Sequence, residues 1–269
     1  MAINALQSAA TGLTALNTAL DVTANNLANV NTDGFKASRA NFQDLLYIEK
    51  AQPGTQNAIG DTTPIGLYIG LGVKVSGTQL DFNQGPPRNT GRSLDLMIDG
   101  DGFLRVQVEP ARGGGTAYTR AGNLAVNRDG QLVLANDQGR RVQPEITIPD
   151  NAEKISIGAD GKVTVTIPGQ VEPQEVGTIE LTTFINPAGL SQEGENLYTE
   201  TAASGPPVSG NPGENNLGIL RQGFLEGSNV DPTRELIEMI RVQRAFEMNS
   251  QSIRAADDTL RNVATLRRS

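Results

Sequence analysis

The 269 residues carry 22 Lys and Arg against 30 Asp and Glu, a formal net charge of -8, and include no His, Cys or Trp. Without His and Cys the chain lacks imidazole bases, thiol nucleophiles, disulfides and the usual zinc ligands, so any catalysis would have to rest on carboxylates, Lys, Tyr or Ser. From the sequence as a whole we predict no enzyme, no catalytic residues, no metal site and no cofactor. The acidic charge repels phosphate groups and argues against nucleic acid as a partner.

The front of the chain is predicted to be a helix of about 27 residues. No Pro occurs from Ile3 to about Asn29, and apolar residues repeat every seven positions, as in a coiled-coil seam. Asp21 is the single charged residue in positions 1 to 32, so the remaining surface suits close packing against identical copies. The predicted subunit-packing residues of this helix are Leu6, Leu13, Leu16, Leu20 and Leu27.

Residues 33–70 are predicted to form an extended connecting segment. The stretch from 50 to 66 is rich in Gly, Pro, Asn and Thr, which favour turns and irregular backbone over a packed core.

Residues 71–228 are predicted to form an antiparallel β domain. Apolar and polar residues alternate with a period of two, which is typical of half-buried strands. Residues 201 to 217 return to a loop-like composition. The predicted strands cover residues 94–98, 103–108, 162–167 and 178–184.

Four Asp-Gly pairs lie between or beside these strands. Glycine supplies the positive φ that tight hairpin turns require. One pair of turns, Asp99 to Gly102, also invites a calcium interpretation, but Met97 and Val106 occupy positions where an EF-hand loop needs oxygen ligands. The four pairs begin at Asp99, Asp101, Asp129 and Asp160.

The back of the chain is predicted to be a second long helix. Asp231 and Pro232 form an N-cap and first-turn pair. Apolar residues again recur every seven positions, and the opposite charges three or four residues apart suit a solvated face. The predicted subunit-packing residues here are Met239, Val242, Phe246, Ile253, Leu260 and Val263.

These elements predict an α+β fold in which a discontinuous terminal helical coiled-coil domain, residues 1–32 and 229–269, carries an inserted antiparallel all-β domain. The ends have net charges of -1 and +1, so residues 33–228 hold the remaining -8. Near-neutral ends and an acidic centre are expected of a subunit whose ends pack inside an assembly while its β domain faces solvent. The alternative from pattern alone is a monomer with an ordinary antiparallel helix pair.

Residues 24–36 resemble the signature of the axial rod and hook proteins of the bacterial flagellum. Read physically, the same stretch is a helix exit in which Asn31 to Gly34 form a turn and Phe35 anchors the following chain. The signature residues are Asn26, Leu27, Ala28, Asn29, Thr32, Gly34, Phe35 and Lys36.

The resemblance extends over nearly the whole chain. Residues 222–231 and the helix that follows are similar to the family's C-terminal segment, and residues 94–103 and 119–123 are similar to its β domain. Within the family, the chain length and the segment from residue 42 to about 66 resemble the distal rod members most. The rod-type residues are Phe42, Leu45, Tyr47, Pro53 and Gly54.

The resemblance implies a structural subunit that forms a homo-oligomeric helical polymer, a rigid hollow shaft that transmits torque to the hook. Implied partners are proximal rod proteins, the hook protein, the peptidoglycan- and outer-membrane-ring proteins and the flagellar type III export apparatus. The implied location is the basal body, in a rod that spans the periplasm, and we expect export without a cleaved secretory signal and no membrane span. The alternatives are a hook or proximal rod protein of the same family, and a β adhesion module on a coiled-coil stalk.

Overall fold

The computed structural model describes residues 2–54, 62, 64–169 and 172–266, and the chain forms two compact units. Unit 1 contains Met1–Ala28, Ser38–Gln79 and Asp231–Ser269, and unit 2 contains Asn29–Ala37 and Leu80–Val230. Within unit 2 we call residues 29–37 the exit segment and residues 226–230 the return segment, because they connect to the two terminal helices.

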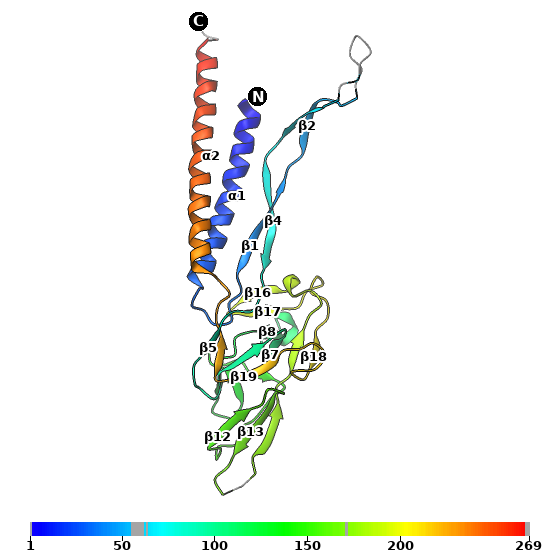
Figure 1. Ribbon diagram of the computed structural model, residues 1–269, viewed down its shortest axis with the longest axis vertical. Coiled ribbons are helices and arrows are strands. Elements are labelled where there is room, and N and C mark those ends of the chain that lie inside the picture. The colour runs from blue at the N-terminus through cyan, green and yellow to red at the C-terminus, as the bar shows by residue number, and fades with distance from the viewer. Residues whose placement is uncertain (1, 55–61, 63, 170–171, 267–269) are drawn as a thin grey trace. The chain divides into compact units, whose positions relative to one another are not determined.

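The predicted helices at both ends are confirmed. Helix α1 spans Ala2–Ala28 and helix α2 spans Pro232–Leu266 (Figure 1). The predicted N-cap is also confirmed, since the Asp231 carboxylate accepts the backbone N–H groups of Thr233 at 2.9 Å and Arg234 at 3.3 Å. This carboxylate satisfies donors that the first turn of a helix otherwise leaves unpaired.

Replacing Asp231 with Ala is therefore expected to destabilise the start of α2 by about 1 kcal/mol. The amides of Thr233 and Arg234 should exchange faster with solvent in this variant, as hydrogen exchange followed by NMR would measure. Asp231→Asn is the matched control, because its amide oxygen still accepts both N–H groups. Equal exchange in Asp231→Ala and wild-type protein would contradict this role.

The two helices lie side by side in unit 1 and meet through small side chains (Figure 1). Ala15 and Val242 are buried, and Asn249 of α2 donates from Nδ2 to the carbonyl of Ala9 at 2.9 Å. Gly12 makes room for this contact, since a Cβ there would lie 2.6 Å from the Asn249 Nδ2. Gly12, although a poor helix former, thus permits close packing of the two helices.

Unit 1 also contains a long two-stranded ribbon in which β1 pairs with β4 and β2 pairs with β3. It contacts α1: the Ser8 hydroxyl donates to the carbonyl of Gly70 at 3.4 Å, and the Val73 N–H donates to the Thr11 hydroxyl at 3.3 Å. Part of the segment that sequence composition suggested to be extended is therefore regular β structure. The strands are β1 Ser38–Asp44, β2 Tyr47–Ala51, β3 Leu67–Gly70 and β4 Val73–Leu80.

Unit 2 is antiparallel β structure, as predicted. Its largest sheet has the strand order β16-β17-β8-β7-β15-β18, with β11 also paired to β7. These strands are β7 Phe103–Gln107, β8 Thr116–Thr119, β11 Val142–Gln143, β15 Leu181–Thr183, β16 Ser191–Gly194, β17 Leu197–Thr199 and β18 Val208–Gly210.

The smaller sheets of unit 2 are the three-stranded β12-β13-β14 and the pairs β9/β10, β6/β19 and β5/β20. Short 3-10 turns occur at Gly113–Gly115 and Pro187–Gly189. The strands are β5 Pro87–Asn89, β6 Leu96–Asp99, β9 Leu124–Val126, β10 Leu132–Leu134, β12 Lys154–Ile157, β13 Lys162–Thr166, β14 Gln174–Thr178, β19 Ile219–Gln222 and β20 Phe224–Glu226.

Two apolar clusters form the core of unit 2. The larger contains aliphatic side chains from most of the strands, including the fully buried Leu96, Leu104 and Leu181. The smaller is aromatic, with edge-to-face ring pairs whose centroids lie 4.8 to 6.0 Å apart. Such pairs add to the stabilisation from burial itself. The aromatic cluster contains Leu80, Phe82, Phe103, Tyr118, Phe184, Leu190 and Tyr198.

Three details of the sequence-based strand prediction were wrong. The single strand predicted over 178–184 is divided, because β14 ends at Thr178 in the three-stranded sheet and β15 begins at Leu181 in the large sheet. The residues from Asp99 to Gly102 have the predicted positive φ at both glycines but join strands of different sheets, and form no hairpin. The predicted loop at 201–217 contains the edge strand β18.

The other two Asp-Gly predictions are confirmed. Gly130 and Gly161 have φ of 76° and 85° and lie between the paired strands β9/β10 and β12/β13.

Candidate functional site

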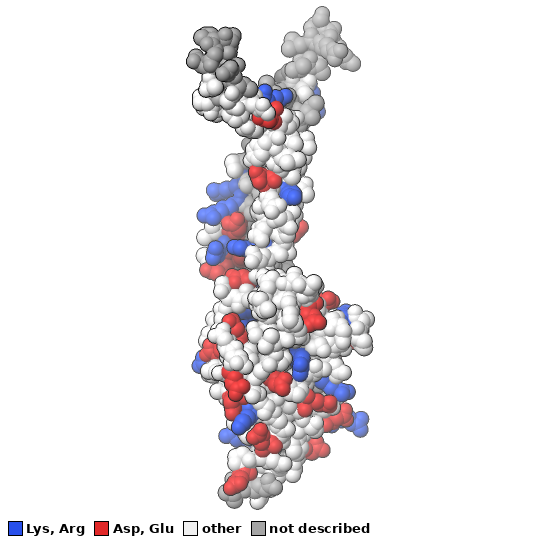
Figure 2. Space-filling model, turned by 90° about the vertical axis from the view of Figure 1, so that its right-hand side faces the viewer, with Lys and Arg blue, Asp and Glu red and all other residues white. Residues whose placement is uncertain are grey.

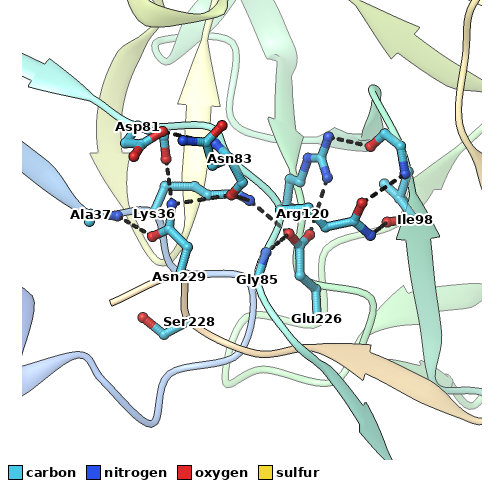
Figure 3. A network of polar contacts seen from close by, with 12 residues as sticks. Lys36, Ala37, Asp81, Asn83, Gly85, Ile98, Arg120, Glu226, Ser228 and Asn229 are labelled. Carbon is cyan, nitrogen blue, oxygen red and sulfur yellow. Dashed lines mark hydrogen bonds and ion pairs between the residues drawn. The ribbon is translucent and has the colours of Figure 1, made fainter. Parts of the chain in front are cut away.

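The exit and return segments of unit 2 lie side by side and are joined through backbone groups (Figure 3). The Gly34 N–H donates to the carbonyl of Glu226 at 2.8 Å, and the Ala37 N–H donates to the Asn229 side-chain oxygen at 2.7 Å. The Asn229 amide nitrogen donates in turn to the carbonyl of Asp81 at 2.7 Å. Asn229 thus joins three stretches of chain that are far apart in the sequence.

A buried ion cluster lies at this junction. The Lys36 ammonium donates to Glu226 Oε1 at 2.7 Å and to the carbonyl of Asn83 at 2.8 Å, and the side chains of Lys36 and Glu226 are both 0 % exposed. The other Glu226 oxygen pairs with Arg120 Nη1 at 3.2 Å. The Gly85 N–H also donates to Glu226, at 2.9 Å. One carboxylate therefore satisfies two buried cations and a backbone amide.

Arg120 connects this ion cluster to the aromatic core of unit 2. Its Nη2 donates to the carbonyl of Gly100 at 2.7 Å, and its guanidinium carbon lies 5.5 Å from the centroid of the Phe103 ring. Its Nε has no hydrogen-bond partner among the described residues. The β core and both connecting segments thus meet at a single carboxylate.

We expect the wild-type protein to become more stable with rising pH when its free energy of unfolding is compared with that of the Lys36→Met variant. Burial is the main cause that lowers the Lys36 pKa from its ordinary 10.5, although Glu226 acts in the opposite direction. Between the lowered pKa and 10.5 the unfolded state binds more protons than the folded state, so linkage makes stability increase with pH.

Urea unfolding of both proteins at a series of pH values up to 10.5 would measure this difference. The same tyrosines are present in both proteins, so their contributions to the difference in stability cancel to a first approximation. A difference in stability that is constant or falls with pH would contradict the assigned direction.

In unit 1, Asn26 closes the loop that leaves α1. Its side-chain oxygen accepts the Ser38 N–H at 3.0 Å, and its nitrogen donates to the Ser38 carbonyl at 2.8 Å. Asn26 is 2 % exposed, so both of these polar groups depend on this pairing. The first signature residue therefore holds the end of α1 against the start of β1.

Helix α2 leaves a row of large apolar side chains in solvent. They follow helical spacing on a face away from the buried Val242. Leu236 is 47 % exposed and Ile240 is 50 % exposed, which is unusual for adjacent turns of a solvated helix. We call this set the α2 apolar face: Leu236, Ile237, Ile240 and Met248.

The ribbon presents a second exposed apolar surface. Two tyrosine rings lie against glycines, since a Cβ at Gly70 would lie 3.3 Å from the Tyr47 ring and one at Gly66 would lie 2.7 Å from the Tyr68 ring. A hydrogen bond to Asp44 raises the Tyr47 pKa. We call the exposed apolar set the ribbon surface: Phe42, Leu46, Tyr47, Ile65, Leu67 and Tyr68.

The predicted packing leucines are only partly buried in the single chain. The buried residues of α1 are small or polar and were not among the predicted packing residues: Ala15, Thr23 and Asn26. Phe246 is 38 % exposed, and the side chain of Val263 lies outside the described part of the structure. The half-buried members are Leu6, Leu13, Leu16, Leu20, Leu27, Met239, Ile253 and Leu260.

The signature and rod-type residues divide between buried and exposed positions. Asn26, Gly34 and Lys36 are buried, whereas Ala28 is exposed. The half-buried signature residues are Leu27, Asn29, Thr32 and Phe35. Of the rod-type residues, Leu45 is half-buried and Phe42, Tyr47, Pro53 and Gly54 are exposed.

The sequence-based site prediction missed Arg120 and Glu226. Both belong to motifs on which the family resemblance rested, but neither was assigned a role. The sequence did contain a signal for Glu226, because it is a charged residue among apolar residues and glycine in Phe224 to Gly227. A charged side chain in such a segment is expected to be buried and therefore to need a partner of opposite charge.

A cavity of about 410 Å³ lies beside the exit segment of unit 2. Asp33, Asn123, Asp137 and Glu195 are among its lining residues. Among the described residues there is no cluster of three or more potential metal ligands, and no described helix is long and apolar enough to cross a membrane. On the face in Figure 2, basic and acidic side chains of the described residues are interspersed, without a continuous basic patch.

Three protein-family models match the chain. Residues 6–36 match the flagella basal body rod protein, residues 97–165 match the D1 domain of the flagellar hook protein FlgE/F/G, and residues 221–266 match the C-terminal part of the flagellar basal body rod FlgEFG protein.

Curated relatives are similar over nearly the whole length. The chain is 45 % identical to the flagellar basal-body rod protein FlgG of Buchnera aphidicola subsp. Schizaphis graminum, covering 95 % of this chain and 96 % of the relative. It is 44 % identical to FlgG of Caulobacter vibrioides, covering 98 % and 100 %. The chain belongs to the flagellar basal-body rod protein family. It is a structural subunit of the rod of the flagellar basal body.

A second type of rod protein is more distant from this rod subunit. The flagellar basal-body rod protein FlgF of Caulobacter vibrioides is 34 % identical, covering 85 % of this chain and 83 % of the relative.

The three family matches meet in the buried ion cluster of this rod subunit. The match at 6–36 contains Lys36, the match at 97–165 contains Arg120, and the match at 221–266 contains Glu226. Segments recognised separately in the sequence thus each supply one charge to the same site.

Proposed function

We propose that the chain is a subunit of the distal rod, whose copies polymerise helically into a straight, rigid and hollow drive shaft that transmits torque to the hook. The observation that carries this proposal is the exposed apolar surface of unit 1. The α2 apolar face and the ribbon surface place at least ten large apolar side chains in solvent. Groups of exposed large apolar side chains of this kind mark interaction sites.

The two surfaces are different in kind, which favours an open polymer over a closed dimer. A contact between the helix face of one copy and the ribbon of the next joins two different surfaces, so it is heterologous, and heterologous contacts that do not close generate helical filaments. In this polymer the half-buried leucines of α1, including Leu13 and Leu20, become fully buried against neighbouring copies, and the terminal helices pack as a coiled coil. The ribbon braces adjacent subunits.

The family relationship supports the wider assignment. We infer that the rod joins proximal rod proteins on one side and the hook protein on the other, and that it turns inside the peptidoglycan- and outer-membrane-ring proteins. In this proposal the subunit reaches the periplasm-spanning rod through the flagellar type III export apparatus without a cleaved secretory signal. It acts mechanically and catalyses no reaction.

Electron microscopy of the concentrated purified protein, seeded with basal-body fragments, tests this proposal. We expect straight hollow tubes of constant diameter. Curved or bendable tubes would indicate a hook protein instead. A protein that stays monomeric under seeding would refute polymerisation, and a variant without both helices that still bound a surface ligand would favour an adhesion module.

A further inference from the structure

The buried ion cluster is unbalanced in charge. Two cations, Lys36 and Arg120, share the single carboxylate of Glu226, and all three side chains are at most 3 % exposed. Asp81 also contributes a favourable interaction with Lys36, but it is an exposed residue and solvent screens it. Glu226 is therefore the only buried anion among the described groups of the cluster.

The three charges come from parts of the chain that have no local reason to meet. Lys36 lies in the exit segment, Arg120 follows β8 and Glu226 begins the return segment, 190 residues after Lys36. Burying a cation without a partner is strongly unfavourable, whereas a paired cation is tolerated. Without Glu226, docking of the exit segment would bring a second buried cation beside Arg120.

We propose that Glu226 acts as a conditional lock: the exit segment docks on the β core only when the return segment is already in place to neutralise Lys36 and Arg120. The exit segment, which follows the end of α1 in the sequence, and the return segment, which precedes the start of α2, are thereby coupled within unit 2. This inference concerns the monomer and does not depend on the proposed polymer, so each can fail without the other.

Because two cations share one anion, we expect loss of the anion to be more harmful than loss of one cation. Removing the anion leaves two unpaired cations, whereas removing Lys36 leaves one balanced pair, Arg120 with Glu226. Glu226→Gln keeps the size of the side chain and an oxygen that can accept the Gly85 N–H. Lys36→Met keeps the aliphatic stem of the lysine. The two variants therefore change the charge with little change of shape.

Hydrogen exchange of the full-length monomer at neutral pH tests the lock through two reporter amides. The Gly34 N–H donates to the Glu226 carbonyl, and the Ala37 N–H donates to Asn229. In Glu226→Gln we expect protection of both amides to fall by on the order of a hundredfold or more. Protection of the core amides of β7, such as that of Val106, should remain.

The companion variants decide between the lock and simpler roles. Lys36→Met should keep both reporter amides within about tenfold of wild-type protection. In the double variant Lys36→Met/Glu226→Gln, one cation is removed with the anion, and protection should recover partly relative to Glu226→Gln.

Glu195→Gln is the matched surface control. Glu195 also pairs with two arginines, Arg140 at 2.9 Å and Arg112 at 3.8 Å, but its side chain is 35 % exposed. Its loss should leave the reporter amides unchanged, because ion pairs at the surface contribute little.

Three results would overturn the lock. Wild-type protection of Gly34 and Ala37 in Glu226→Gln would show that docking does not require the anion. Equal losses in Lys36→Met and Glu226→Gln would show that the contacts matter but the charge balance does not. Loss of core protection together with the reporter amides would show a general contribution to the core in place of conditional docking.

Discussion

Replacing Ile237 and Ile240 together with Asp should abolish tube formation and leave the monomer folded. Both side chains are about half exposed on the α2 apolar face, so carboxylates there cost the monomer little, within about 0.5 kcal/mol each. In the proposed polymer they would be buried without a partner, which is strongly unfavourable. Electron microscopy and sedimentation would measure assembly, and thermal unfolding would measure monomer stability.

The matched control for this prediction is Ile240→Met, which keeps an apolar side chain of similar volume at the same position. Tubes should form with this variant as with wild-type protein. Normal tubes from the double Asp variant would remove the α2 apolar face from the assembly interface, and an unfolded monomer would mean that these side chains serve the fold of unit 1.

Gly34→Ala, at the glycine of the exit segment, is expected to destabilise unit 2 strongly. Gly34 has φ of +72°, and a Cβ there would lie 2.8 Å from the backbone nitrogen of Ala121. The left-handed conformation costs about 1 to 2 kcal/mol for Ala, and the overlap with backbone adds about 1 to 3 kcal/mol. Urea unfolding should therefore show a loss of about 2 to 5 kcal/mol.

Gly54→Ala separates these two contributions. Gly54 has a similar φ of +82°, but no atom of the described residues lies within 4 Å of the Cβ that would be added. We expect a loss of only about 1 to 2 kcal/mol from the conformational cost. If both variants lost the same stability, the close approach of Gly34 to Ala121 would have no energetic consequence.

The elements that depend on local pattern were predictable from the sequence. The heptad repeats and the Asp231 N-cap predicted both helices, and glycine chemistry predicted the turns at Gly130 and Gly161. These signals act over a few residues, so each can be read without knowledge of the rest of the chain.

Other features depend on partners that are remote in the sequence. The strand at 178–184 was predicted as one element because its alternation is continuous, but the chain passes there from one sheet to another. The charge cluster joins residues up to 190 positions apart, and nothing local shows that Glu226 meets Lys36. The family resemblance identified the motifs but not their meeting point.

The leucine repeat of α1 predicted an apolar stripe but not what packs against it. A seven-residue period indicates an apolar stripe but does not state which molecule covers it. In the single chain Asn249 of α2 approaches Gly12 of α1 closely and Ala15 is buried, whereas the stripe at Leu13 and Leu20 is only partly covered. In the proposed polymer, neighbouring copies complete the burial of this stripe.

The contact between Asn249 and the carbonyl of Ala9 also bears on how force passes through the helix pair. Apolar side chains alone would allow α1 to slide along α2 by a turn, about 5.4 Å, at modest cost. A single polar group between two helices fixes their register, because any shift leaves it unpaired. Because a Cβ at Gly12 would lie 2.6 Å from the Asn249 Nδ2, we expect the glycine and the asparagine together to hold α1 and α2 in this register.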